Sequence, residues 1–586
     1  MTASLVAKPG GAARPRWVLP LLLAAALVTV VLPLVQPVNG YLSNLFMQAA
    51  TYAMAVLGLT VVLGYTGQIS LAQASFFGLG AYGVAIGTTT LHLYFLPALV
   101  LGVLVAALFG AVLGASTLKL GGHYLAMVTI SFQQILTLVL TNWIGLTNGP
   151  DGIRNIPRPG LFEDPGRYLA LCLVTLYAVG FFVWWLKRTK LGLGMQAVRD
   201  NELAAEVVGV DTYRVKVTAF CLSALLGGLG GGLFAGGFSY ISPDQFSFNE
   251  SVVFMTMVLL GGADAAVGSA IGTVLLILLP EWLRFLRGAY LAVYGLAVIL
   301  IMVFMPTGLW GLLSRLGGPP RLRERGLPEP LTLGGETRGG TLLEIRGLAK
   351  HFGGLKALDG VDLAVERGKV HALIGPNGSG KTTMLNVLSG IYKPTRGEVL
   401  VDGAKVSGLP PHALAAAGVG RTFQNIRLFH SLTVIENVVI GAQRPNNAAA
   451  STPDEVQHRA MAALQFVGMA DRADLKVASL PYGHQRLVEI ARALAGNPTL
   501  LLLDEPAAGL NLTEKQELVG LLKRLAGHGL TLFLIDHDMN LVEQMADRIT
   551  VLNFGKRIAE GKPADVLRHP DVIAAYLGEV PDDAAA

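Results

Sequence analysis

The sequence predicts a polytopic α-helical membrane domain followed by a soluble α/β domain. The chain has 586 residues, of which 52% are hydrophobic and only 15% are charged, so it is too apolar for a disordered protein and too long for a single domain. Its charges are unevenly distributed, because residues 1–316 carry 16 basic and 11 acidic side chains whereas residues 317–586 carry 29 of each. We therefore predict a membrane domain over 1–316, a linker over 317–340 and a soluble domain over 341–586.

The charge distribution argues against nucleic-acid binding. The formal net charge is +5, and the whole excess lies before residue 317. A nucleic-acid-binding protein usually carries its basic surface on the soluble domain, whereas basic loops are typical of the cytoplasmic side of a membrane protein. The two cysteines, Cys172 and Cys221, lie in apolar stretches, so they suggest neither a disulfide framework nor a metal site.

The first expected membrane span is the apolar run 17–35, which follows a short basic segment. It is longer than the apolar region of a secretory signal peptide, and about 20 apolar residues in a helix cross ~30 Å of hydrocarbon. The stretch 252–278 contains two adjacent glycines and Asp264, so one helix and two shorter helices both fit it. The remaining spans are expected over 42–63, 70–90, 96–117, 124–145, 168–186, 217–238 and 289–308.

Polar side chains within the expected spans are compatible with two roles. They either line a translocation path or form hydrogen bonds between helices, and both readings stay open. The side chains concerned are Gln68, Ser70, Gln73, Ser75, Ser131, Gln133 and Gln134. Asp264 is expected in a loop between two half-spans. The glycine-rich stretch 227–237 predicts close helix packing, and the unpatterned mixture of Pro, Gly and charge over 317–340 predicts a solvated tether.

The soluble domain contains a phosphate-binding loop in its first part. The strand-like run 369–374 leads into GPNGSGKT, in which four residues separate Gly375 from Gly380 before Lys381 and Thr382. Backbone N–H groups of such a loop wrap phosphates, and we expect Lys381 to reach the β- and γ-phosphates of ATP and Thr382 to hold Mg²⁺. A plain glycine-rich turn is the alternative. The predicted nucleotide-binding residues here are Gly375, Pro376, Asn377, Gly378, Ser379, Gly380, Lys381, Thr382 and Thr383.

Two further strands end in side chains that suit phosphate chemistry. The all-apolar run 500–503 leads to Asp504 and Glu505, as a buried parallel strand does when it presents carboxylates at its carboxyl end. We expect Asp504 to support Mg²⁺ and Glu505 to polarise the attacking water. The run 530–536 ends at His537, which is placed to contact the γ-phosphate.

The order of these motifs resembles the ATP-binding domain of an ABC transporter. Gln424, in GRTFQNIRLF, and the segment SLPYGHQRLVEIARAL lie between the phosphate-binding loop and Asp504. The resemblance implies that Gln424 binds Mg²⁺ and acts with Glu505 and His537 in catalysis. It also implies that Phe352 stacks on adenine. The signature residues Tyr482 and Gly483 would contact the nucleotide of an opposite subunit.

The signature departs from the usual Leu-Ser-Gly-Gly-Gln of this family. Here it reads LPYGH, and Pro481 has neither a hydroxyl nor a backbone N–H to offer the γ-phosphate. The stretch that usually ends Leu-Asp ends Leu510-Asn511. We expect the composite site completed by this signature to hydrolyse ATP more slowly than its pair. The defect favours a heterodimer, since a homodimer would carry it twice.

Other stretches resemble the branched-chain (hydrophobic) amino-acid ABC importers. Ala204, Ala205 and Gly209 match the Ala-Ala-x-x-x-Gly coupling helix of binding-protein-dependent importers, and GYTGQISLAQASFFGLGAY, YISPDQFSF and DVIAAYLGE match this system's permease and ATPase. The chain thus looks like a natural or constructed fusion of the two subunits. The resemblance implies a second permease and ATPase and an extracytoplasmic solute-binding protein as partners, with membrane lipid around the spans.

Function and topology follow as expectations. The resemblance implies ATP-driven import of hydrophobic amino acids, although relatives also carry amides, urea or aromatic acids. An exporter-type half-transporter and a membrane-anchored signalling or mechanical ATPase are the alternatives. We expect a bacterial cytoplasmic (inner) membrane location with both termini in the cytoplasm, which requires an even number of spans, eight or ten. Segment 187–216 and the residues after Arg315 would then be cytoplasmic, and 146–167 would face outward.

Overall fold

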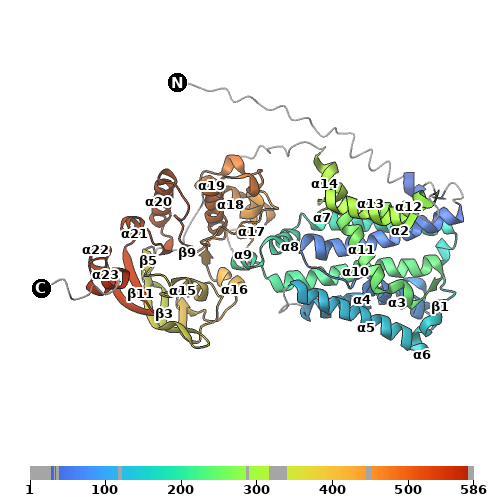
Figure 1. Cartoon of the computed structure of the whole chain (residues 1–586), viewed down its shortest axis with the longest axis horizontal. Coiled ribbons are helices and arrows are strands. Elements are labelled where there is room, and N and C mark those ends of the chain that lie inside the picture. Colours follow the sequence, from blue (N-terminus) through green and yellow to red (C-terminus); the bar gives the residue numbers. More distant parts are fainter. Residues whose placement is uncertain are drawn as a thin grey trace, which may run out of the picture. The chain divides into compact units, whose positions relative to one another are not determined.

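The computed structural model describes two compact units (Figure 1). Contacts group Met1–Arg199 with Tyr213–Arg321 in the first unit and Asp200–Thr212 with Leu322–Ala586 in the second. The residues described are 28–31, 33–34, 39–116, 122–285, 290–305, 307–315, 331, 339–443 and 452–577. Most of the first expected span, 17–35, and most of the expected linker therefore lie outside the described residues.

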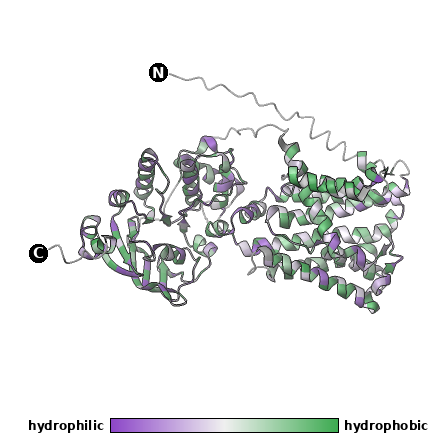
Figure 2. Ribbon diagram, in the orientation of Figure 1, coloured by the Kyte–Doolittle hydropathy of each residue, from purple (hydrophilic) through white to green (hydrophobic). Residues whose placement is uncertain are grey.

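The first unit consists of helices and one antiparallel pair of short strands, β1 (Ile153–Arg154) and β2 (Tyr240–Ile241), and Figure 2 colours its helices largely as hydrophobic. Six helical stretches of the described residues are long and apolar enough to cross a membrane, namely Gly40–Tyr65, Phe95–Ser116, Tyr124–Asn142, Pro165–Leu186, Thr212–Phe238 and Ala266–Phe285. The helices are α2 (Gly40–Leu59), α3 (Gln73–Thr89), α4 (Phe95–Ser116), α5 (Gly122–Asn142), α6 (Ile144–Thr147), α7 (Pro165–Leu186), α8 (Lys190–Asp200), α10 (Thr212–Phe238), α11 (Phe248–Gly261), α12 (Ala266–Trp282), α13 (Tyr290–Phe304) and α14 (Gly308–Arg315). A π-helix, η1 (Thr60–Tyr65), extends α2.

The stretch 252–278 forms two helices. α11 ends at Gly261 and α12 begins at Ala266, and Gly262 between them has φ +103°. Asp264 therefore lies in the connecting loop, and 67% of its side-chain surface is exposed. It accepts a hydrogen bond from Arg199 through its carboxylate and one of 2.5 Å from Lys187 Nζ through its carbonyl. The prediction that Asp264 lies in a loop between two helices is confirmed, but only α11 is short, because the stretch Ala266–Phe285 is long enough to cross a membrane.

Small residues and aromatic rings pack the centre of this unit. A Cβ on Gly231 would overlap the Phe77 carbonyl, and one on Gly80 would overlap Gly228, so α10 and α3 approach at backbone distance. Beside this contact, the ring of Phe77 lies 5.3 Å from that of Phe234 and 5.6 Å from that of Phe254. The prediction of close packing by the stretch 227–237 is confirmed.

Two of the buried glutamines bond to neighbouring helices. Gln73 Nε2 donates to Ala55 O at 2.7 Å and its Oε1 accepts from Ser223 Oγ at 2.8 Å. Gln133 Oε1 accepts from Ser75 Oγ at 2.6 Å, and Gln133 Nε2 donates to a backbone carbonyl at 2.6 Å. Since an unsatisfied amide is costly in lipid, these bonds account for the burial of both glutamines without a solute.

The second unit contains two sheets. One has six strands in the order β12-β11-β5-β10-β9-β8, parallel from β11 to β8, and the other is antiparallel in the order β4-β3-β6-β7. The bounds are β3 (Thr341–Phe352), β4 (Leu355–Glu366), β5 (Val370–Ile374), β6 (Arg396–Val401), β7 (Ala404–Lys405), β8 (Val419–Arg421), β9 (Leu500–Asp504), β10 (Thr531–Ile535), β11 (Arg548–Asn553) and β12 (Lys556–Gly561). β5, β9 and β10 are buried at every residue, which explains their uninterrupted apolar sequences.

Helices surround the parallel sheet of the second unit (Figure 1), and α9 packs on α16. Their bounds are α9 (Glu202–Val207), α15 (Lys381–Leu388), α16 (Pro411–Ala416), α17 (Val434–Ala442), α18 (Pro453–Phe466), α19 (Tyr482–Ala495), α20 (Leu512–Gly527), α21 (Met539–Met545), α22 (Pro563–Val566) and α23 (Pro570–Leu577). α17, α18 and α19 share one apolar cluster with β9 and α20. Neighbouring parallel strands thus bring their carboxyl ends to one edge of the sheet.

Candidate functional site

The phosphate-binding loop joins β5 to α15. Gly375, Gly378 and Gly380 have φ of +151°, +79° and +104°, values that residues with a Cβ rarely adopt. Lys381 begins α15 and its Nζ donates to Gly375 O at 2.7 Å and to the Pro376 carbonyl at 2.9 Å. Its ammonium therefore lies folded over the loop, at the end of a helix that presents free backbone N–H groups.

The surroundings of Lys381 change its pKa. Desolvation lowers the pKa of Lys381, and the carboxylates of Glu505 and Asp504 oppose the shift. The two acids therefore lie close enough to influence Lys381 electrostatically, although they come from a different strand. This arrangement provides one cation and two carboxylates around the loop, which suits a phosphate together with a divalent metal ion.

Asp504 and Glu505 lie at the carboxyl end of β9. Asp504 is 4% exposed and its Oδ2 lies 3.5 Å from Arg421 Nη2. Burial raises the pKa of Asp504, and the Arg421 guanidinium opposes the rise. Glu505 follows with φ +44°, a strained conformation for a residue with a Cβ. Such strain is typical of functional sites.

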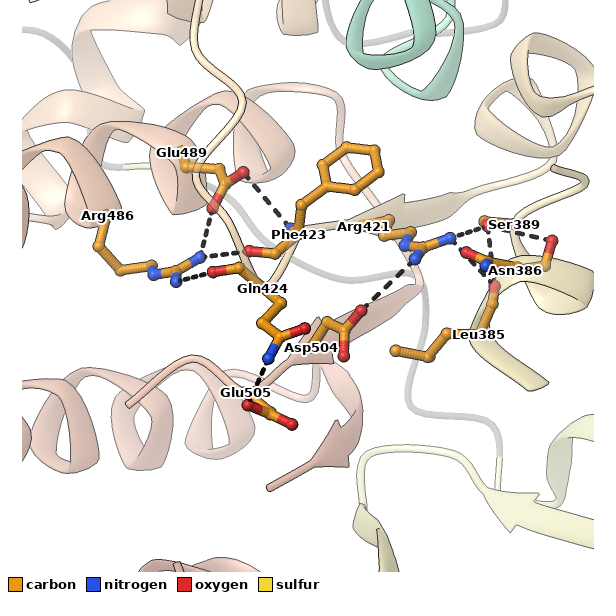
Figure 3. A network of polar contacts seen from close by, with 10 residues as sticks. All are labelled: Leu385, Asn386, Ser389, Arg421, Phe423, Gln424, Arg486, Glu489, Asp504 and Glu505. Carbon is orange, nitrogen blue, oxygen red and sulfur yellow. Dashed lines mark hydrogen bonds and ion pairs between the residues drawn. The ribbon is translucent and has the colours of Figure 1, made fainter. Parts of the chain in front are cut away.

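Gln424 and His537 converge on Glu505. Gln424 Nε2 donates to Glu505 Oε2 at 2.8 Å, and His537 Nδ1 lies 3.5 Å from the same oxygen (Figure 3 shows the first contact). His537 follows the strand next to that of Glu505, and Gln424 follows β8 on the other side. The structure thus brings the three expected catalytic side chains together.

The expected adenine and Mg²⁺ ligands have suitable surroundings. Phe352 ends β3 with 41% of its surface exposed and packs edge-on against Tyr392, with ring centroids 5.2 Å apart. Lys350 Nζ lies 4.9 Å from the centroid of the Phe352 ring, and the exposure of the side chain separates it from a core aromatic. The hydroxyl of Thr382, the amide of Gln424 and the carboxylate of Asp504 are oxygen donors of the kind that Mg²⁺ prefers.

The signature residues begin α19. Pro481 is the N-cap and provides no side-chain hydrogen bond to the helix. The ring of Tyr482 lies against Gly509, and Gly483 lies against the Glu514 side chain. In the described part of the chain neither residue hydrogen-bonds the phosphate-binding loop of its own chain. Their role toward an opposite subunit stays a prediction. Asn511 caps α20, since its Oδ1 accepts from the Glu514 N–H at 2.9 Å.

The expected coupling helix is α9, and it groups with the second unit. Asn201 caps it by accepting from the Ala204 N–H at 2.9 Å, and Gly209 follows with φ +103°. Ala204 and Ala205 are fully buried. Glu206 Oε1 lies 3.7 Å from His412 Nδ1 of α16, and the Asp200 carboxylate accepts from the Ser431 N–H at 2.7 Å. Small residues therefore let the segment seat against the ATPase fold.

Four polar residues of the site lacked a sequence signal. Arg421 donates to Ser389 and to the Leu385 carbonyl besides its ion pair with Asp504 (Figure 3). Arg486 and Glu489 form a buried pair on α19. Tyr576 of α23 lies within hydrogen-bonding reach of the Gly375 backbone. On a helix, charges three residues apart usually mark a solvated face, and only their burial distinguishes the pair on α19.

Family models match the membrane part and the soluble part of the chain separately. The family model described as branched-chain amino acid transport system / permease component matches residues 41–306. The ABC transporter model matches residues 358–508, and the branched-chain amino acid ATP-binding cassette transporter model matches 556–582. The permease model thus matches the first half of the chain, and the two ATP-binding models match the second.

Curated relatives and solved structures cover the ATP-binding half. The chain is 44% identical over 250 residues to the high-affinity branched-chain amino acid transport ATP-binding protein BraF of Pseudomonas aeruginosa, covering 41% of this chain and 98% of that protein. It is 43% identical to LivG of Escherichia coli, with the same coverage. A nucleotide-free ATP-binding cassette from an ABC transporter aligns over 41% of this chain and 100% of that chain, with 32% identity and a TM-score of 0.38.

Proposed function

Because the chain belongs to the branched-chain amino acid ABC transporter family, with permease and ATPase fused, we propose that it imports branched-chain or related hydrophobic amino acids. Its ABC ATPase domain couples ATP hydrolysis to transport, and its apolar helices make it a multi-pass membrane protein. The convergence of Gln424, Glu505 and His537 beside the phosphate-binding loop supports the proposal most directly.

In the proposed site, each side chain has a defined task. Lys381 and the loop N–H groups bind the phosphates, and Phe352 stacks on the base. Glu505 orients the attacking water and accepts its proton, while His537 contacts the γ-phosphate. Thr382, Gln424 and Asp504 would hold Mg²⁺, which neutralises charge on the phosphate oxygens. Burial raises the pKa of Asp504, and Arg421 opposes that rise, which favours the ionised carboxylate that this task needs.

ATP binding drives transport only if it favours one arrangement of the transporter over another. Closure of two nucleotide domains around ATP is the proposed driving step, and the α9 segment is the proposed link to the membrane helices. One permease and one ATPase cannot form both composite sites, so a second pair is required. We propose a heterodimer on the ground that Pro481 weakens the signature, together with an extracytoplasmic solute-binding protein.

Location follows from the same proposal. The ATPase half and both chain ends are placed in the cytoplasm of a bacterium, because ATP is available there. The basic residues of segment 187–216 agree with that side under the positive-inside rule.

Reconstitution tests the proposal. The chain, co-expressed with its neighbouring permease and ATPase subunits, is placed in proteoliposomes with internal ATP and Mg²⁺. External radiolabelled leucine loaded on the solute-binding protein should then accumulate inside. Solute transport that needs no binding protein would favour an exporter-type half-transporter. ATPase activity that responds to no solute-loaded binding protein would favour a signalling or mechanical ATPase.

A further inference from the structure

The signature helix carries a buried ion pair whose contacts reach beyond its own helix. Arg486 and Glu489 lie three residues apart on α19, with side chains 1% and 0% exposed, and Arg486 Nη1 lies 2.7 Å from Glu489 Oε2. Taking two charges out of water is costly, so a pair this deeply buried needs further hydrogen bonds to satisfy its remaining donors and acceptors.

Those hydrogen bonds go to the Gln424 loop (Figure 3). Arg486 donates from Nη1 to Phe423 O at 2.5 Å and from Nη2 to Gln424 O at 2.7 Å. Glu489 Oε1 accepts from the Phe423 N–H at 3.4 Å and from the Arg427 N–H at 3.3 Å. The pair therefore holds two carbonyls and two amides of a segment that has no regular secondary structure.

The held segment leads directly to the catalytic carboxylate. Gln424 Nε2 donates to Glu505 Oε2 at 2.8 Å, so one continuous path runs from α19 through the Gln424 peptide to Glu505. The same helix begins at Tyr482, one turn before Arg486, with the residues expected to contact the nucleotide of the opposite subunit. α19 thus carries the signature at its start and, one turn later, the side chains that hydrogen-bond to the Gln424 loop.

We propose that Arg486, held in place by Glu489, is a positioning residue for Gln424 that makes the Gln424 loop move with the signature helix. When the signature of this chain contacts ATP in one composite site, the movement of α19 then positions the Gln424 amide in the other composite site. This inference rests on the proposed function, because it assigns Gln424 a task at the ATP site. It adds a residue and a physical link between the two sites.

The test uses the complete transporter and measures ATPase rate against ATP concentration. Arg486→Gln should lower kcat about 10-fold, as loss of a partner that orients a ligand-binding residue does, with little change in the KM for ATP. It should also lower the Hill coefficient for ATP toward 1. Arg486→Lys, which keeps the charge but offers no planar fork, should recover part of kcat.

Two further variants separate positioning from folding. Arg486→Gln with Glu489→Gln removes both charges of the pair, and it should keep the low kcat because glutamine cannot reach both carbonyls. Since Glu489 Oε1 also lies 3.8 Å from Nη2 of the buried Arg492, thermal unfolding of this variant is measured beside its kcat. Arg459→Gln is the matched control, since Arg459 is a buried arginine that donates to Ala495 O and Asn497 Oδ1. It should keep kcat and the Hill coefficient.

A double-mutant cycle decides the assignment. In a Gln424→Ala background, Arg486→Gln should lower kcat by less than a further factor of about two, because the effects of residues that act through each other are not additive. Full additivity, or a wild-type kcat in the Arg486→Gln, Glu489→Gln variant, would overturn the proposal. If those results appear while Lys381→Ala still abolishes ATPase activity, the positioning role fails and the proposed function stands. If Lys381→Ala retains ATPase activity, the proposed function fails first.

Discussion

The ion pair between Arg421 and Asp504 allows a prediction with a worked magnitude. The two charges lie 3.5 Å apart and are both nearly fully buried. At an effective dielectric constant of ~20 their gross attraction is about 5 kcal/mol, and removing one partner of a buried pair typically costs about 3–5 kcal/mol. Arg421→Met should therefore destabilise the ATPase fold by roughly 3 kcal/mol at neutral pH.

The destabilisation should depend on pH. Burial raises the pKa of Asp504 above its ordinary value while Arg421 opposes the rise, so removing Arg421 should raise the pKa further. A folded state with a raised carboxyl pKa holds its proton more tightly than the unfolded state, so stability falls as pH increases through that pKa. Relative to wild type, the free energy of unfolding of the variant should therefore decrease as the pH rises from acidic to neutral. At acidic pH the difference should be smallest.

Activity should follow the same protonation. Because Mg²⁺ needs an ionised Asp504, the acidic limb of the ATPase pH profile should move to higher pH and more Mg²⁺ should be required at each pH. The assay is the rate of phosphate release by the assembled transporter from pH 5.5 to 8.5, with thermal unfolding in parallel. Arg427→Met is the matched control, because Arg427 lies over the Phe423 ring at 5.1 Å as Arg421 does at 4.9 Å. An acidic limb that stays in place in Arg421→Met would show that Arg421 does not influence the ionisation of Asp504.

Three other predictions concern separate parts of the chain. Phe352→Ala should raise the KM for ATP about tenfold, since stacking on a base is worth about 1–3 kcal/mol, while Phe352→Trp should not; an unchanged KM would remove Phe352 from the site. Glu505→Gln should lower kcat at least about 100-fold while nucleotide binding, followed by fluorescence titration, persists; most activity remaining would place the faster composite site elsewhere. Asp264→Asn should change stability by less than about 1 kcal/mol, because the Asp264 side chain is 67% exposed, yet lower the leucine transported per ATP; an unchanged ratio would exclude a coupling role for this loop.

Most of the fold follows from patterns that the sequence carries locally. The spans expected over 96–117 and 217–238 correspond to α4 and α10, because apolar length alone defines a membrane helix. The convergence of Glu505 and His537 was predictable since parallel strands end at one edge of the sheet. The exposed face of Phe352 agrees with its predicted role in binding adenine.

Other features depend on contacts that no local pattern encodes. Gln73, for example, bonds to Ala55 on α2 and to Ser223 on α10, which lies 150 residues later in the chain. Arg486 and Glu489 have the spacing of an ordinary surface pair, and only the packing of α19 against the Gln424 loop buries them. Arg421 likewise acquires its role from β9, about 80 residues later in the chain.

The central claim is that nucleotide bound at the ATPase half drives solute across the membrane half. The most direct measurement is leucine uptake by proteoliposomes that contain the complete transporter with Lys381→Ala, beside the wild-type complex at equal incorporation. Both ATP hydrolysis and uptake should fall to background while assembly is unchanged. Uptake at the wild-type rate with Lys381 replaced would contradict it.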